Sequence, residues 1–171
     1  VEARAAVRTA VEFEGPVYMR FGRLAVPVIN DRETYKFELG KGVTMKDGND
    51  ITIVATGLMV NEALEASKIL ENEGISARVV NIHTIKPLDK ELIYKCAKET
   101  GVIVTAEEHS VIGGLGSAVA EAVTECCPVP VVKIGVNDVY GHSGPAVDLL
   151  KEFGLSSENI VNTVKKAINL T

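Results

Sequence analysis

The sequence predicts an α/β fold in which helices cover both faces of a mostly parallel sheet. From residue 49 onward, short apolar segments alternate with segments whose apolar residues recur at helical spacing. Strands that are apolar throughout are typical of a parallel sheet buried on both faces. Glycines and prolines separate most of these segments and indicate the turns between them. Together these features favour a three-layer α/β/α domain.

Four strands and five helices are predicted in this region. The strands are expected at residues 51–56, 77–82, 102–106 and 131–134. The helices are expected to end near residue 73, to span 90–99, to run from about 117 to 126, and to cover 145–153 and 158–168. We expect Asp89 to cap the second helix, because its carboxylate can accept from the free amides of the first turn. Gly101 should end that helix, and Ser156 or Ser157 should cap the last one.

The first 48 residues are less regular. Residues 1–14 have the apolar spacing of a helix, and Gly15-Pro16 should end it before a short strand at Val17–Phe21. One helix and one strand cannot bury their own apolar faces, so we expect them to need a partner sheet. Residues 25–48 are predicted to form a linker along the surface, with Tyr35–Leu39 as its best strand candidate.

Composition limits the classes of partner and the cellular compartment. A net charge of −5 argues against nucleic acid or an anionic membrane as the main partner. The apolar runs are too short to cross a bilayer, and no signal peptide is predicted at the start of the chain. The three cysteines show neither a disulfide framework nor CxxC spacing. This indicates free, buried thiols in a reducing compartment, and therefore a cytoplasmic location.

The segment Glu107–Ser117 is the most distinctive in the sequence. It follows a predicted strand and opens a helix, so its backbone amides could bind an anion. It is no dinucleotide fingerprint, since Gly114 and Gly116 fit but position 119 is Val. It also lacks the Gly-Lys-Ser/Thr of a P-loop. The alternative, which we favour, is that the glycines allow close packing of the helix on the strand.

Three histidines follow predicted strands and could share one edge of the sheet. His83, His109 and His142 belong to no HxH or HExxH pair, so no metal site is predicted. One of them could help to form a substrate cleft, since imidazole suits proton transfer near neutral pH. No Ser/His/Asp order or GxSxG segment supports nucleophilic hydrolysis, and no catalytic residue is assigned.

Two arginines lie at the end of the predicted strand Val17–Phe21. Residues 1–47 hold 8 Lys/Arg against 7 Asp/Glu, so the basic groups most available to an anionic ligand lie early in the chain. The guanidinium groups of Arg20 and Arg23 present fixed donors that match phosphate oxygens. From the residues alone, an ordinary surface or interdomain salt bridge is the better interpretation of either arginine.

Several segments, taken in order, resemble the transketolase family over essentially the whole chain. The segments are residues 15–23, 50–57, 86–89, 107–117 and 138–145. Residues 15–23 are similar to the end of the family's pyrimidine-binding domain, and residues 50–57 to the first strand of its carboxy-terminal domain. Residues 138–145, followed by Leu149-Leu150 and Phe153-Gly154-Leu155, favour transketolase itself. Each segment alone is moderately specific.

The resemblance implies a domain division and one site residue. Residues 1–24 would be the tail of the pyrimidine-binding domain, 25–48 a linker, and 49–171 the transketolase carboxy-terminal domain. In the family, the arginine matching Arg23 binds the phosphate of the sugar substrate. The implied activity is transfer of a two-carbon ketol unit between phosphorylated sugars in the pentose phosphate pathway of carbohydrate metabolism. A homo-oligomer such as a dimer is expected.

The resemblance also implies groups that this chain would not hold by itself. The complete enzyme uses thiamine diphosphate and a divalent metal such as magnesium. The family's activating glutamate would lie upstream of Val1, and the Gly-Asp-Gly-type motif that holds the diphosphate does not occur here. We therefore expect a truncated chain that binds no cofactor and is inactive alone. Its partner would be an amino-terminal transketolase section or the missing domains.

Two alternatives to transketolase stay open at this point. Deoxyxylulose-phosphate synthases and the β chains of 2-oxoacid dehydrogenases share the same terminal domain and act on 2-oxo acids. The other alternative is a non-catalytic module that shapes a dimer or mediates an interaction.

Overall fold

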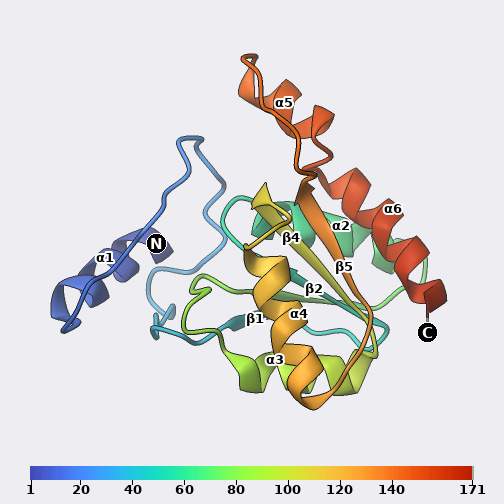
Figure 1. Ribbon diagram of the computed structural model, residues 1–171, viewed down its shortest axis with the longest axis horizontal. Coiled ribbons are helices and arrows are strands. Elements are labelled where there is room, and N and C mark those ends of the chain that lie inside the picture. Colours follow the sequence, from blue (N-terminus) through green and yellow to red (C-terminus); the bar gives the residue numbers. More distant parts are fainter. Residues whose placement is uncertain (171) are drawn as a thin grey trace.

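A five-stranded sheet forms the centre of the molecule (Figure 1). The computed structural model describes residues 1–170. The strands are β1 (Val43–Lys46), β2 (Ile51–Ala55), β3 (Ala77–Asn81), β4 (Ile103–Ser110) and β5 (Val131–Val136), in the order β1-β3-β2-β4-β5. The four strands from β2 to β5 are parallel, and β1 pairs with β3 in the antiparallel direction.

Helices cover both faces of this sheet, which confirms the predicted three-layer α/β/α fold. The helices are α1 (Glu2–Glu12), α2 (Met59–Asn72), α3 (Lys90–Thr100), α4 (Leu115–Cys126), α5 (Ala146–Glu152) and α6 (Ser157–Ala167), with a 3-10 turn η1 (Ile168–Leu170) at the end. Helices α2 and α6 lie on one face, and α3 and α4 on the other. None of the helices within residues 1–170 is long and apolar enough to cross a membrane.

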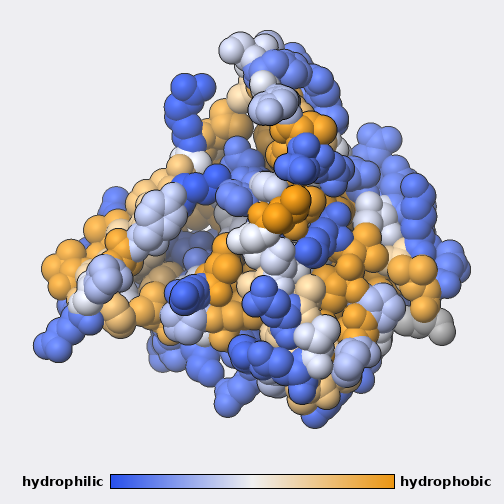
Figure 2. All heavy atoms as spheres, viewed as in Figure 1, coloured by the Kyte–Doolittle hydropathy of each residue, from blue (hydrophilic) through white to orange (hydrophobic). Residues whose placement is uncertain are grey.

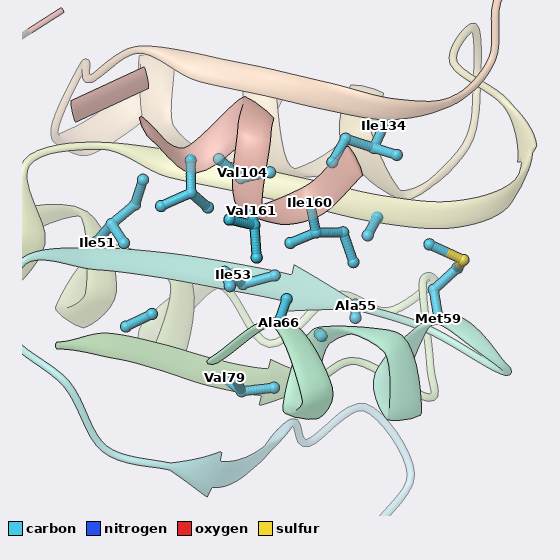
Figure 3. Packing of buried hydrophobic residues seen from close by; sticks show 14 of the residues in the cluster. Ile51, Ile53, Ala55, Met59, Ala66, Val79, Val104, Ile134, Ile160 and Val161 are labelled. Carbon is cyan, nitrogen blue, oxygen red and sulfur yellow. The ribbon is translucent and has the colours of Figure 1, made fainter. Parts of the chain in front are cut away.

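Two apolar clusters hold the layers together, one on each face. Successive strand residues point to opposite faces, so Ile53 joins the cluster under α2 and α6 while Val54 joins the cluster under α3 and α4. Figure 3 shows the first cluster, in which Ile53 lies with Ile160 of α6 and Ala66 of α2. All five residues of β2 are buried, and so are all five of β3. This explains why β2 is apolar apart from Thr52, whereas β3 also buries the polar side chains of Arg78 and Asn81.

Helix ends lie where the sequence predicts them. The Oδ1 of Asp89 accepts from the amide of Leu92 at 3.2 Å, as expected of an N-cap. Gly101 ends the same helix in the left-handed region, with φ 69°. Ser156 rather than Ser157 caps α6, with its Oγ accepting from the amide of Asn159 at 3.3 Å.

Two predicted strands do not form, and one forms where none was predicted. Val17–Phe21 is irregular in the structure, and so is Tyr35–Leu39. The strand β1 lies instead at the end of the predicted linker and covers the outer edge of β3, whose backbone groups need partners. The side chains of Tyr35 and Phe37 are partly buried although this segment pairs with no strand. Tyr35 donates a hydrogen bond to Glu2, and Phe37 stacks on His83.

The strand β4 is longer than predicted, and its extra residues matter for the site. The sequence predicts an end at Ala106, whereas the structure continues the strand to Ser110. The pairing with β5 is irregular between Ala106 and Ser110. Glu107, Glu108 and His109 therefore lie on an extended backbone at the carboxyl end of the sheet.

The segment before Ile29 lies outside the sheet domain, whereas Ile29 itself packs against the first apolar cluster. The predicted helix at residues 1–14 is confirmed as α1, but it buries no residue within the chain. Residues 11–23 are exposed without exception. Figure 2 shows apolar side chains gathered over this part of the surface, at the left of the view. Its exposed large apolar residues are Val1, Val7, Val11, Phe13, Val17, Tyr18, Met19, Phe21, Val26 and Val28.

Candidate functional site

The candidate site lies at the carboxyl ends of β4 and β5, where residues 20–24 cross the edge of the sheet domain. In parallel sheets this edge carries the loops that form binding sites. A pocket of about 270 Å³ lies there between the chain ends of β4 and β5 and the region of α5. Its lining consists of Arg23, Leu24, Glu108, Val136, Ala146, Leu149, Leu150, Phe153 and Leu155. The two charged groups, Arg23 and Glu108, come from segments 85 residues apart.

The guanidinium of Arg23 is free at this pocket. Arg23 is exposed, and within residues 1–170 it makes neither a hydrogen bond nor an ion pair. A free guanidinium at a pocket whose other lining residues are apolar except for Glu108 offers several fixed donors to an incoming anion. The structure therefore places the predicted substrate-binding residue at a pocket.

The second arginine, Arg20, is not free. Its Nη2 donates to the main-chain carbonyl oxygen of Glu108 at 2.7 Å. The backbone at Gly22 also lies close to this residue, since a Cβ at Gly22 would be 3.8 Å from the Oε2 of Glu108. The segment that carries both arginines is therefore joined to the end of β4.

The glycine-rich start of α4 holds a carboxylate of the chain itself. Glu107 is buried, with 1% of its surface exposed, and its two oxygens accept from the amides of Leu115 at 2.7 Å and Gly116 at 2.8 Å. A Cβ at Gly114 would overlap the Glu107 carboxylate. A Cβ at Gly116 would lie 2.7 Å from the Oγ1 of Thr105. The glycines thus permit close packing, and Glu107 fills the place that an external anion would take.

Sequence reasoning missed the role of Glu107. The residue was part of the singled-out segment, yet nothing in its spacing shows that its side chain turns back to a helix beginning eight residues later. A buried acidic residue at the end of an apolar strand, just before a glycine-rich helix start, is the signal that could have suggested it.

His83 lies in a polar cluster at the end of β3. It is half-buried and stacks on Phe37 with ring centroids 4.2 Å apart, while its Nδ1 lies 2.8 Å from the Oγ1 of Thr84. Burial lowers the pKa of His83, and the nearby charge of Glu2 opposes that shift. The Oε2 of Glu2 accepts from the hydroxyl of Tyr35 at 2.8 Å and from the side-chain Nδ2 of Asn81 at 2.6 Å. This cluster docks α1 on the sheet domain.

The other two histidines lie on the surface with partners of their own. His109 is exposed, and its Nδ1 lies 3.1 Å from the carbonyl oxygen of Ser110. His142 pairs through Nε2 with the Oε1 of Glu152 at 2.8 Å, and this hydrogen bond raises the pKa of His142. In the part of the chain that the structure describes, no hydrogen bond or ring contact joins the three histidines to one another.

The cysteines are free, but only one is buried. Cys96 is a residue of α3 and is buried in the apolar cluster that α3 and α4 form with the sheet. Cys126 is exposed and Cys127 is intermediate, so the expectation of three buried thiols is wrong for this pair. Both lie at the carboxyl end of α4, of which Cys126 is the last residue and Cys127 the C-cap.

The described residues do not fit a cofactor of the kind that the resemblance implies. The N-terminus of α4 is already neutralised by Glu107, so it offers no cradle for a diphosphate. No three His, Cys, Asp or Glu side chains among residues 1–170 are placed to hold a metal ion. Thiamine diphosphate and a metal therefore have no site built from these residues alone.

Comparison with known proteins decides the family. The family model for the C-terminal domain of transketolase matches residues 40–160. This chain belongs to the transketolase family. The match begins nine residues before the predicted domain start and includes β1, the strand that the sequence had left in the linker.

Relatives of this transketolase-family chain include both whole enzymes and separate subunits. It is 47% identical over 160 residues to the 6-deoxy-6-sulfo-D-fructose transketolase subunit of Clostridium sp. strain MSTE9, covering 94% of this chain and 49% of that protein. It is 44% identical over 162 residues to the 1-deoxy-D-xylulose-5-phosphate synthase of Heliobacterium modesticaldum, covering 94% of this chain and 25% of that protein.

A solved structure supports the fold over almost the whole transketolase-family chain. It is described as a split gene transketolase in an inactive beta4 tetramer, and the two chains share 54% identity with a TM-score of 0.94. The alignment covers 98% of this chain and 55% of the other. The present chain thus spans about half the length of the split transketolase subunits that it matches.

Proposed function

We propose that this chain is the carboxy-terminal part of a transketolase that transfers a two-carbon ketol unit between phosphorylated sugars. It would act when joined to the domains that hold thiamine diphosphate and magnesium, supplied by an amino-terminal section or by missing domains. We further propose a role in the pentose phosphate pathway of the cytoplasm, as part of a homo-oligomer. The family membership and the similarity to split transketolase subunits support this proposal.

The observation that carries the proposal is the free guanidinium of Arg23 at the pocket. The family resemblance assigns substrate phosphate to this arginine, and in the structure the side chain has no competing partner among residues 1–170. Binding a phosphate far from the reacting carbons would orient the sugar and supply binding energy, with no direct part in the chemistry. This residue would be a substrate-binding group, and no residue of the chain is proposed to be catalytic.

The test is Arg23→Ala in the enzyme reconstituted with its amino-terminal section. Hydrogen bonds to charged groups are worth about 1.5–3 kcal/mol, and 1.4 kcal/mol corresponds to a factor of ten. We expect kcat/KM for a phosphorylated acceptor to fall about 10- to 150-fold. The value for an unphosphorylated acceptor such as glycolaldehyde should hardly change, because it has no phosphate to lose.

A matched control is Arg32→Ala, which removes an exposed arginine that makes no hydrogen bond or ion pair in the described chain and does not line the pocket. Its kinetics should equal those of the unmodified enzyme with either acceptor. Equal Michaelis constants for the phosphorylated acceptor in Arg23→Ala and Arg32→Ala would remove the assignment of Arg23.

A second candidate substrate class is suggested by the relative that is named for a sulfonated sugar. Sulfonate and phosphate both present tetrahedral oxygens to a guanidinium, so the free Arg23 fits either group. Comparing kcat/KM for a ketose phosphate with that for a 6-sulfonated ketose would separate the two candidates.

The alternatives of 2-oxo acid chemistry and of a non-catalytic module also have direct tests. Similarity to a 1-deoxy-D-xylulose-5-phosphate synthase keeps the first of them open. Turnover of pyruvate in place of xylulose 5-phosphate by the reconstituted protein would favour it. Thiamine diphosphate binding by the isolated chain would contradict the proposal that this part holds no cofactor.

A further inference from the structure

We propose that Arg20 is a positioning residue that holds Arg23 at the pocket by binding the main chain of β4. This inference rests on the proposed function, because it assigns Arg23 to the anionic group of the substrate. It adds a role for a second arginine, which does not itself touch the substrate. It also gives the carboxyl end of β4 a role in forming the site.

The geometry that supports this role is one long-range hydrogen bond. The Nη2 of Arg20 donates to the carbonyl oxygen of Glu108 at 2.7 Å, between residues 88 positions apart in the sequence. Within residues 1–170, it is the only hydrogen bond between residues 15–28 and the sheet domain. The exposed segment that follows α1 in Figure 1 is therefore fixed to the sheet at Arg20.

Fixing Arg20 restricts where Arg23 can lie. Three residues of extended chain span about 10 Å at most, so an anchor at Arg20 confines the backbone of Arg23 to the neighbourhood of Glu108. The pocket agrees with this, since Arg23 and Glu108 both line it. Without the anchor, a segment with no buried residue between positions 11 and 23 would be free to move, and Arg23 would pay a larger entropy cost on binding substrate.

The acceptor in this contact explains why the two arginines have different roles. Arg20 already donates a hydrogen bond to the carbonyl oxygen of Glu108, whereas Arg23 has no partner in the described chain. The Glu108 carboxylate lines the pocket with Arg23 and also lies near Gly22, so the difference between the two arginines comes from their hydrogen-bond partners. Substrate binding is thus assigned to Arg23 and anchoring to Arg20.

The inference is tested in the reconstituted enzyme with Arg20→Ala, Arg20→Lys, Arg23→Ala and the Arg20→Ala/Arg23→Ala double variant. A single hydrogen bond sets the scale, so Arg20→Ala should raise KM for a phosphorylated acceptor about 2- to 10-fold and leave kcat unchanged. Arg20→Lys should restore part of the effect, because an ammonium can still donate to the carbonyl. In the double variant KM should equal that of Arg23→Ala, since Arg20 acts only through Arg23.

Arg32→Ala is the matched control, because it removes an exposed arginine that makes no hydrogen bond or ion pair in the described chain and does not line the pocket. Its KM should change less than about 2-fold, within the range of ordinary surface substitutions. Amide hydrogen exchange supplies a second readout: exchange of residues 17–24 should accelerate in Arg20→Ala and stay unchanged in Arg32→Ala.

The outcomes separate this inference from the proposed function. If Arg23→Ala lowers kcat/KM and Arg20→Ala changes neither KM nor exchange, the positioning role is refuted and the function stands. If the effects of the two substitutions add in the double variant, Arg20 binds substrate independently, which also refutes positioning. If Arg23→Ala itself changes nothing, the function and the positioning role fail together.

Discussion

Replacing Glu107 by Gln should destabilise the domain more than any other single change to a carboxylate at this end of the sheet. The side chain is buried, and its two oxygens accept from two amides at the start of α4, at 2.7 and 2.8 Å. No cation within residues 1–170 pairs with Glu107. The free amides and the positive end of the helix therefore compensate its charge.

The magnitude follows from what Gln cannot do. Its carbonyl oxygen can accept from one of the two amides, but its NH₂ group would face the other amide, donor against donor. One charge-assisted hydrogen bond becomes a neutral one, and one buried donor loses its partner, at a cost of about 1–3 kcal/mol for the orphaned group alone. We expect a total loss of about 2–4 kcal/mol from the free energy of unfolding. A domain of this size has about 5–15 kcal/mol in all.

Urea denaturation followed by circular dichroism measures this loss. With a slope of about 2 kcal/mol per molar urea, the midpoint should fall by about 1–2 M. The melting temperature should fall by about 4–16 °C, at 2–4 °C for each kcal/mol. Protein concentration must be held equal across variants, because association shifts apparent stability.

Two further variants make the reasoning refutable. Glu108→Gln alters the neighbouring carboxylate, which makes no side-chain hydrogen bond in the described structure, and should change stability by less than about 0.5 kcal/mol. Gly114→Ala should be destabilised comparably to Glu107→Gln, since its Cβ would displace the Glu107 carboxylate. A loss below about 1 kcal/mol in Glu107→Gln would show that the carboxylate does not hold the start of α4.

The remaining predictions concern the last two helices. Ser156→Ala should cost about 1 kcal/mol of stability, because the amide of Asn159 loses its capping oxygen, and the same urea assay measures it against Ser157→Ala as control. The hydrogen bond that His142 donates to the Glu152 carboxylate raises the pKa of His142. The stability that this pair contributes should therefore be fully present below the ordinary histidine pKa and be lost as pH rises through the raised value. An NMR titration of His142 should show a lower pKa in Glu152→Gln, and an unchanged value would contradict the pairing.

Local signals in the sequence were sufficient for most of the fold. Helical spacing located α2, α3 and α6, and the cap at Asp89 and the stop at Gly101 lie where propensity places them. These features depend on neighbours a few residues apart, and such contacts are written directly in the sequence. The family resemblance likewise depended on short segments in a fixed order, and the comparisons confirm it.

Strand predictions failed where pairing, rather than composition, decides. Val17–Phe21 has the residues of a strand, but no strand edge of the described chain lies beside it. Val43–Lys46 has a weaker pattern and still forms β1, because the open edge of β3 supplies the hydrogen-bond partners. The division of residues 1–171 into domain tail, linker and carboxy-terminal domain stays a prediction.

By itself, the sequence determined the α/β class, most helix ends and the transketolase family. The role of Arg23 at an anionic substrate follows from the family resemblance and stays a prediction. Only the tertiary structure decided that Glu107 fills the helix start, that Arg20 binds the carbonyl of Glu108, and that Arg23 is left free at a pocket. The reason is physical: these contacts join residues from 8 to 88 positions apart, and their distances are set by how the layers pack. No local pattern of residue types encodes such a distance.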